Sequence, residues 1–179
     1  MPGSSRLSQR IAEGDGIAII VRVEDADGAR AAEQQGAKAV AVAGWIEGIR
    51  AVTSLPLLWI SAGMPVDADA MTVRPDADAE GTELETVVDV RDEDDVERAL
   101  ERHAPEIFLL SPGPGNGDAD PLDAVLELLP DVPAGKLAIA DVAVRHRDEV
   151  LALERAGIHA VLVPPGNVAG LVGDRLPDL

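Results

Sequence analysis

Eight short apolar runs recur along the chain in a strand-then-helix order, and this cadence constrains the fold more than any other feature. The runs are continuous rather than alternating, as strands covered on both faces require. They are Ile17–Val23, Ala39–Ala43, Pro56–Ser61, Ala70–Arg74, Leu84–Val90, Glu106–Leu110, Leu137–Asp141 and Ala160–Val163. Strand, helix and strand in regular order imply right-handed crossovers and a parallel sheet. Eight such strands predict a closed (β/α)8 barrel, the TIM-barrel fold.

Four amphipathic segments between these runs predict helices. They span Asp27–Gln35, Glu93–His103, Leu122–Leu129 and Arg147–Ala156. Gly36 and Gly157 follow the first and last of them, where a left-handed residue commonly ends a helix.

Two connections are too short for a crossover helix, namely Ala62–Asp69 and Pro75–Glu83. A barrel of this class typically has about 250 residues, and this chain has 179. We therefore expect a compact barrel in which two or three outer helices are shortened or missing. A doubly wound open sheet is the alternative, but it normally has five or six strands with a helix in every crossover.

The length suits a single domain over residues 1–179, with 1–15 as a short N-terminal segment. No charged-then-apolar leader and no apolar run near 18 residues occurs in the sequence, so neither secretion nor membrane insertion is predicted. We expect a cytoplasmic protein. Cysteine is absent, which removes disulfides and thiolate chemistry.

The formal net charge is −18, and Lys38 and Lys136 are the only lysines. Binding to nucleic-acid backbones depends on clustered cations, so nucleic acid is not an expected partner. An acidic surface suits molar salt, because at about 1 M the Debye length falls to about 3 Å and self-repulsion is screened. A halophilic host and an acidic protein from a high-GC mesophile both remain open.

Polar side chains stand at the carboxyl ends of several predicted strands, where barrel active sites lie. Period-two alternation points Arg22, Glu24, Asp89, Ser111 and Asp141 into the barrel mouth. One interpretation is an internal ion pair of Arg22 with Asp89 or Asp141 that fills a degenerate pocket. The other is a catalytic site, with these carboxylates as acid–base groups or as oxygen ligands of Mg²⁺. Three scattered carboxylates without histidine are a weak metal signal, so no metal and no cofactor is predicted.

Several segments resemble indole-3-glycerol phosphate synthase. The resemblance covers nearly all of the chain except the family's N-terminal helix and the helices around strand four. It is carried by Gly16–Glu24, Glu33–Ala37, Leu55–Leu58, Val87–Leu100 and Arg155–Val163. The family closes an indole ring on a carboxyphenylamino-deoxyribulose phosphate with loss of CO₂, using a lysine acid, a glutamate base and a phosphate cradle.

The chain departs from that family's pattern at the positions that carry chemistry. The general-acid lysine aligns with Ile60, and the family's Glu-Val-Lys on strand one becomes Arg22-Val23-Glu24. Strand five keeps a carboxylate, Asp89, in place of glutamate, and on strand seven Asp141 likewise replaces glutamate. The strand-six Asn-Asn-Arg becomes Ser111-Pro112-Gly113. Isoleucine cannot transfer a proton, so turnover by the family mechanism is not expected.

The phosphate cradle is reduced as well. Its strand-eight Gly-Glu-Ser aligns with Pro164-Pro165-Gly166, and proline has no N–H to donate. Gly166 and Asn167 can still donate where barrel phosphate sites often form. Arg145, before His146 and Arg147, is a second place where an anion could dock near the start of a helix. The stretch 111–117 is glycine-rich but matches neither the Walker pattern nor GxGxxG.

If Ile60 faces inward as the family lysine does, Leu57 and Trp59 face outward where a helix is missing. An exposed aromatic beside apolar strand surface commonly marks an interface. This predicts a homodimer that buries Trp59, Leu57 and Trp45; folding of residues 45–52 and 62–66 over Trp59 is the alternative.

These observations together predict a divergent synthase-like barrel without synthase activity that binds a small phosphorylated molecule at its mouth. An active synthase-type lyase of tryptophan biosynthesis and a carboxylate or metal-dependent enzyme are the alternatives.

Overall fold

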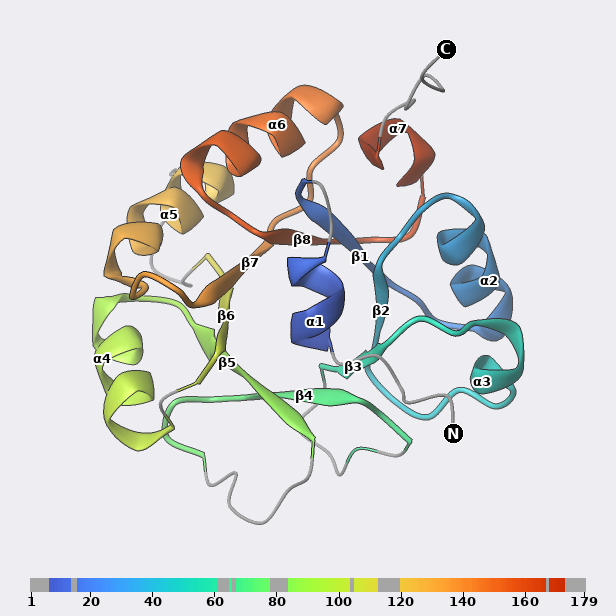
Figure 1. The fold of residues 1–179 in the computed structure, drawn as a ribbon, viewed down its shortest axis with the longest axis horizontal. Helices are drawn as coiled ribbons and strands as arrows, with labels where there is room; N and C mark the ends of the chain where they lie inside the picture. The colour runs from blue at the N-terminus through green and yellow to red at the C-terminus, as the bar shows by residue number, and fades with distance from the viewer. Residues whose placement is uncertain are drawn as a thin grey trace.

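Eight parallel strands form a closed barrel, as the apolar runs predict (Figure 1). The computed structural model describes residues 7–13, 16–60, 65, 67–77, 84–103, 105–112, 120–166 and 168–172. The strands follow one another around the ring in chain order, and β8 closes it by pairing with β1. They are β1 Ala18–Arg22, β2 Ala39–Val42, β3 Leu57–Trp59, β4 Ala70–Val73, β5 Glu85–Val90, β6 Ile107–Leu110, β7 Leu137–Asp141 and β8 Ala160–Val163. The open doubly wound sheet is thereby excluded.

Alternate side chains of each strand separate into two apolar layers. The inward residues fill the barrel. Ile20, Leu58 and Ile139 are examples, and all three are fully buried. The outward residues, such as Val21 and Phe108, form a second layer beneath the surrounding elements. Burial on both faces explains why the strands are continuous apolar runs instead of alternating ones.

Four helices of the outer ring lie where the periodicity predicts them: α2 Ala26–Gln34, α4 Glu93–Arg102, α5 Pro121–Leu128 and α6 Arg147–Ala156. Asp25, Asp92 and Asp120 cap the first three by accepting backbone N–H hydrogen bonds, which satisfies groups that have no partner within the helix. Gly36 and Gly157 take left-handed φ values of 98° and 108°, as expected at helix ends. Three shorter pieces complete the set: α3 Ile49–Val52, the 3₁₀ turn η1 Leu129–Asp131 and α7 Val168–Val172.

The side of the barrel around β4 carries no helix in the described residues, which is the predicted gap (Figure 1). The chain that leaves β4 runs instead along α4, and polar side chains at the end of that helix form hydrogen bonds with its backbone. Arg102 donates to the Asp76 carbonyl at 2.8 Å, and the His103 ring lies 3.0 Å from the Pro75 carbonyl. Arg74 joins the same contact through a 3.0 Å ion pair with Asp95. Hydrogen bonds and ion pairs thus replace part of the apolar cover that a helix would give.

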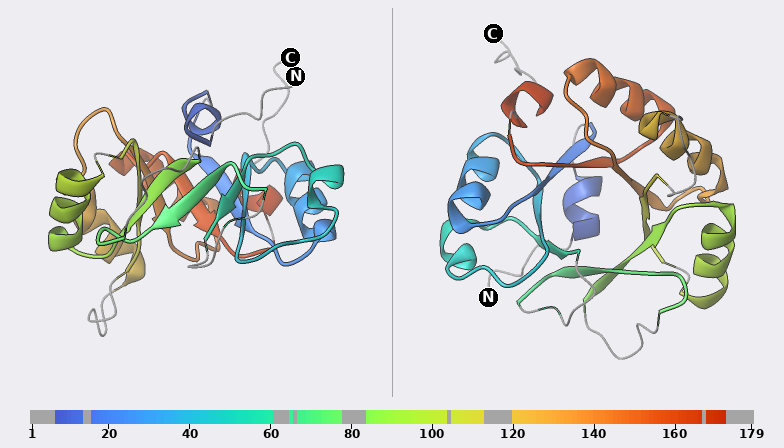
Figure 2. Two further views of the ribbon diagram at one scale, coloured as in Figure 1. Left: turned by 90° about the horizontal axis from the view of Figure 1, so that it is seen from below. Right: turned by 180° about the vertical axis from the view of Figure 1, so that it is seen from behind.

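A helix that is not among the four predicted from the sequence precedes the first strand. This helix, α1 Leu7–Ala12, lies across the end of the barrel where the strands begin (Figure 2, left). Its Leu7 and Ile11 are buried against the barrel interior. Glu85, at the start of β5, accepts from the Ser8 backbone N–H and from the Ser8 hydroxyl at the helix's first turn. The spacing of Leu7 and Ile11, four positions apart, was the feature of the sequence that could have predicted this helix.

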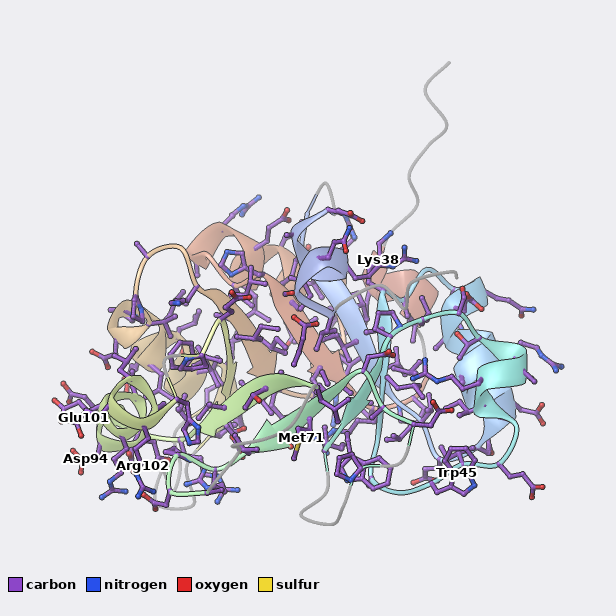
Figure 3. The ribbon with its side chains drawn as sticks, turned by 60° about the horizontal axis from the view of Figure 1, so that its bottom comes forward. Lys38, Trp45, Met71, Asp94, Glu101 and Arg102 are labelled. Atoms are coloured by element: carbon purple, nitrogen blue, oxygen red, sulfur yellow. The ribbon has the colours of Figure 1, made fainter. Side chains whose placement is uncertain are left out.

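Trp59 and Leu57 face outward as expected, but the expectation that they are exposed is wrong. Trp59 is 5% exposed and Leu57 2%, both within the outer apolar layer, against which Ile46 and Met71 also pack. Trp45, by contrast, is 53% exposed and lies at the end of the barrel opposite Lys38 and α1 (Figure 3). The chain itself therefore covers two of the three residues predicted to form a dimer interface.

No helix among the described residues has both the length and the apolar character needed to cross a membrane.

Candidate functional site

The carboxyl ends of the strands form a polar mouth at the end of the barrel opposite α1. The inward series of β1, β5, β6 and β7 continues to Arg22, Asp89, Ser111 and Asp141, because side chains two positions apart share a face. The structure brings these four predicted residues together through hydrogen bonds. Glu24, the fifth, is exposed beyond the end of β1 and forms no hydrogen bond or ion pair with the described residues.

Arg22 and Asp141 form an ion pair across the mouth. The Arg22 Nη2 lies 2.8 Å from Asp141 Oδ1 and 2.9 Å from Oδ2. These residues end β1 and β7, with β8 between them, so the pair spans the end of β8. The Arg22 side chain is 44% exposed and that of Asp141 26%. Of the two carboxylates that the sequence offered as partners for Arg22, Asp141 is the one that it contacts.

Asp89 occupies the other side of the mouth. Ser111 donates its hydroxyl hydrogen to Asp89 Oδ1 at 2.8 Å. The Asp89 Oδ2 lies 3.7 Å from Arg74 Nη1 and 3.5 Å from Arg91 Nη2. Arg74 also donates to the Asp89 carbonyl at 2.8 Å. This carboxylate is therefore compensated by two cations and one hydroxyl.

Arg74 and Arg91 also contact the mouth residues, although they are not among those predicted from the sequence. Both follow the same alternation, Arg74 four positions after the inward Ala70 and Arg91 two after Asp89. Each lies one position beyond its strand, as the predicted Ser111 does. The alternation was therefore a sufficient signal for them.

The pKa of Asp141 is raised above its usual value. Burial of the carboxyl group is the largest cause, since a low-dielectric environment disfavours the charged form. Arg22 acts against it by stabilising the carboxylate, and the negative charge of Asp89 adds to the upward shift. A hydrogen bond with Ser111 likewise favours the charged form and acts against the upward shift of the pKa. The mouth thus holds two carboxylates with different partners, Arg22 for Asp141 and Arg74, Arg91 and Ser111 for Asp89.

No lysine reaches this mouth. Ile60 lies at the end of β3 and packs against the barrel interior. Lys136 directly precedes β7 and Lys38 directly precedes β2, so both stand at the opposite end, where Figure 3 shows Lys38 beside α1. The cations at the mouth are the guanidinium groups of Arg22, Arg74 and Arg91.

The residues expected to bind phosphate are only partly described. Gly166 is exposed with φ 154°, whereas Asn167 lies outside the described residues, as do 113–117 of the glycine-rich stretch. Arg145 is exposed, and its backbone N–H donates to Glu149 Oε1 at 3.1 Å. The His146 N–H donates to the same oxygen at 3.2 Å. A carboxylate of the protein itself therefore occupies the start of α6, where an anion was expected to dock.

Within the part of the chain that the structure describes, no three histidine, aspartate or glutamate side chains gather closely enough to hold a metal ion. Asp89 and Asp141 pair with arginines and Ser111 instead. A carboxylate- or Mg²⁺-dependent enzyme stays an alternative that these contacts do not test.

Two curated relatives are similar to part of this chain. Indole-3-glycerol phosphate synthase of Variovorax paradoxus is 34% identical over 95 residues, which are 53% of this chain and 35% of that protein. The synthase of Acidithiobacillus ferrooxidans is 30% identical over 118 residues, 64% of this chain and 42% of that protein. The match thus covers less than half the length of either relative. No protein-family model matches the chain.

A solved structure supports the fold. N-acetylmannosamine-6-phosphate 2-epimerase from Clostridium perfringens superposes with a TM-score of 0.64 over 82% of this chain and 86% of that one. The identity is 15%, so the likeness concerns the fold alone. The chain is a compact TIM barrel with distant, partial similarity to indole-3-glycerol phosphate synthase.

Proposed function

We propose that this barrel is a divergent relative of indole-3-glycerol phosphate synthase that has no synthase activity and binds a small phosphorylated molecule at its mouth. The observation that carries the proposal is the Arg22 guanidinium. It stands half exposed at the mouth, and Nη2 alone makes both contacts with Asp141. Its Nη1 and Nε form no hydrogen bond with the described residues. Guanidinium nitrogens that have no protein acceptor are suited to donating to a phosphate or carboxylate ligand.

The position of Arg22 supports a phosphate as the bound group. In barrels of this fold, phosphate sites frequently lie at the loops after strands seven and eight. The Arg22–Asp141 pair spans β7, β8 and β1, and Gly166 follows β8 within three residues. We therefore propose that a phosphate oxygen contacts Arg22, with the N–H groups of Gly166 and Asn167 as further donors and Arg145 as a more distant cation.

The loss of synthase activity follows from the proton-transfer groups. General acid catalysis requires a titratable group within reach of the substrate. Ile60 stands where the family resemblance places the acid, and both lysines stand at the other end of the barrel. Asp141 is a titratable group at the mouth, but Arg22 engages both of its oxygens.

Calorimetric titration with inorganic phosphate and with ribose 5-phosphate tests binding. We expect binding by the unaltered protein and at least about tenfold weaker binding by Arg22→Gln, because a charged hydrogen bond contributes about 1.5–3 kcal/mol. Arg155→Gln, the same change of charge in the last turn of α6, is the matched control and should bind normally. Equal affinity of the two variants would contradict the role of Arg22.

Turnover is tested separately by incubating the folded protein at molar salt with the synthase family's phosphorylated substrate and following the fluorescent indole product. We expect no product above the control without protein. Product formation that is lost in Asp141→Asn would show instead that an aspartate has replaced the lysine acid, and the chain would then be an active lyase.

A further inference from the structure

The cation proposed to bind a ligand already holds an anion of the protein itself. Both oxygens of Asp141 lie within 2.9 Å of Arg22 Nη2. A ligand phosphate or carboxylate presents the same pair of oxygens to the same guanidinium. It must either displace Asp141 from Arg22 or settle on Nη1 and Nε beside it. In the first case Asp141 loses its cation, and in the second case it shares that cation with another negative charge.

The groups around Asp141 leave it little other compensation. Arg22 faces it from β1, Asp89 from β5 and Ser111 from β6. The intervening strand β8 contributes Leu162 to the barrel interior and Pro164 after its end, neither of which titrates. Arg74 and Arg91 contact Asp89 rather than Asp141. Arg22 is therefore the only cation in contact with Asp141 among the described residues.

Ser111 supplies an acceptor for a protonated Asp141. A hydroxyl group has one hydrogen and two lone pairs, and Ser111 gives its hydrogen to Asp89 Oδ1 at 2.8 Å. Its oxygen then has lone pairs available to accept from a protonated Asp141, in place of the hydrogen bond by which Ser111 otherwise favours the charged form of Asp141. Ser111 is only 7% exposed, so water competes little for this contact. A neutral Asp141 thus finds a partner in place without rearrangement of the strands.

We infer that an oxyanion, a phosphate or a carboxylate group, binds at Arg22 together with one proton from solvent, which Asp141 takes up. The proton adds to one Oδ of Asp141, and no bond of the ligand forms or breaks. The inference rests on the proposed function, because it concerns a ligand bound at the same arginine. It adds that the Arg22–Asp141 pair makes anion binding depend on pH.

The direction of that dependence follows from linkage. Burial and Asp89 already favour the neutral carboxyl, whereas Arg22 and the Ser111 hydrogen bond oppose them. An anion on Arg22 weakens this opposition and raises the pKa of Asp141 further. A complex that holds one more proton than the free protein gains affinity as the pH falls, by up to about tenfold per pH unit. The gain ends once Asp141 is protonated in the free protein too.

The experiment is calorimetric titration of the full chain with sulfate, which does not itself titrate over the pH range used. Titrations at one pH in two buffers of different ionisation enthalpy give the number of protons taken up. We expect uptake approaching one proton for the unaltered protein and none for Asp141→Asn, which should bind sulfate at least as tightly because it no longer competes. Asp148→Asn in the first turn of α6 is the control and should retain the uptake.

The outcomes distinguish a failure of this inference from a failure of the proposed function. Sulfate binding with no proton uptake, or with equal uptake by Asp141→Asn, overturns this inference and leaves the proposed function standing. Absence of binding for sulfate, acetate and inorganic phosphate alike overturns both. Parallel titrations with acetate and phosphate separate the two ligand sources, because the stronger binder identifies a carboxylate or a phosphate ligand.

Discussion

The two ends of this barrel are held by different forces. At the end where the strands begin, α1 lies across the opening and buries Leu7 and Ile11 against the barrel interior. At the other end, arginines and aspartates face one another across the mouth and continue outward through Arg74 to Asp95 on α4. Apolar burial is nondirectional and excludes water, whereas partly exposed ion pairs contribute little stability. The closed end, which α1 covers, is therefore expected to contribute more to stability than the open end at the mouth.

The largest effect is expected at the closed end. Leu7→Ala removes a fully buried side chain and should lower the free energy of unfolding by about 2–4 kcal/mol. Gln9→Ala on the exposed face of the same helix is the control and should change it little. Thermal unfolding measures both, and sulfate titration of Leu7→Ala should be unaltered. An equal loss in the two variants would mean that α1 does not seal the barrel by apolar packing.

The next effect concerns the outer part of the open end. The Asp95 carboxylate is 6% exposed and contacts Arg74 at 3.0 Å and the Arg91 N–H at 3.1 Å. Asp95→Asn leaves its partners without a countercharge and should cost about 1.5–3 kcal/mol. Asp94→Asn, exposed on the same helix (Figure 3), is the matched control. Chemical denaturation would refute a role for this ion pair in stability if both variants unfolded alike.

Asp141 gives a smaller effect that depends on pH. Its pKa is higher in the folded chain than its usual value of 3.8, so the folded state binds more protons and stability increases as the pH falls through the folded-state pKa toward 3.8. Asp141→Asn should lack this increase. At neutral pH it should differ by no more than about 1 kcal/mol, since the pair is partly exposed. The contribution of Asp141 is the difference in unfolding free energy between the unaltered protein and Asp141→Asn, measured as a function of pH. A difference that does not vary with pH would contradict the raised pKa of Asp141.

His159 at the closed end should show the opposite slope. Its Nδ1 accepts the Ala138 N–H at 3.1 Å, and burial lowers its pKa below the usual 6.5. A protonated imidazole has no acceptor nitrogen, so stability should fall as the pH drops below 6.5 through the folded-state pKa. His159→Asn keeps an acceptor and should lose this slope. The stability of the two proteins should be measured by unfolding between pH 7 and 5. If both lose stability in parallel over this range, His159 is not the source of the decrease.

The exposed Trp45 bears on the homodimer, which stays a prediction. Trp59 and Leu57 are buried within one chain, so a partner could cover Trp45 but not these two. Light scattering at micromolar concentration, with Trp45→Ala for comparison, tests a dimer through this face. A monomer mass for the unaltered protein would remove it.

The amino-acid sequence by itself determined the barrel. Its eight apolar runs coincide with eight strands, and Gly36 and Gly157 end helices where they were expected. These features were predictable because strand burial and helix caps depend on the nature and spacing of neighbouring residues. The same alternation pointed Arg22, Asp89, Ser111 and Asp141 inward, since it needs only the count along each strand.

Only the tertiary structure decided which of these residues meet. Arg22 could have paired with Asp89 or Asp141, and the register of β7, β8 and β1 brings it to Asp141. Neither the covering of Trp59 nor the docking of α1 on the strand starts could be read from local pattern, because both depend on segments distant in sequence. Local periodicity orients each side chain relative to its own strand, whereas contacts between strands depend on how the closed barrel staggers them around its axis.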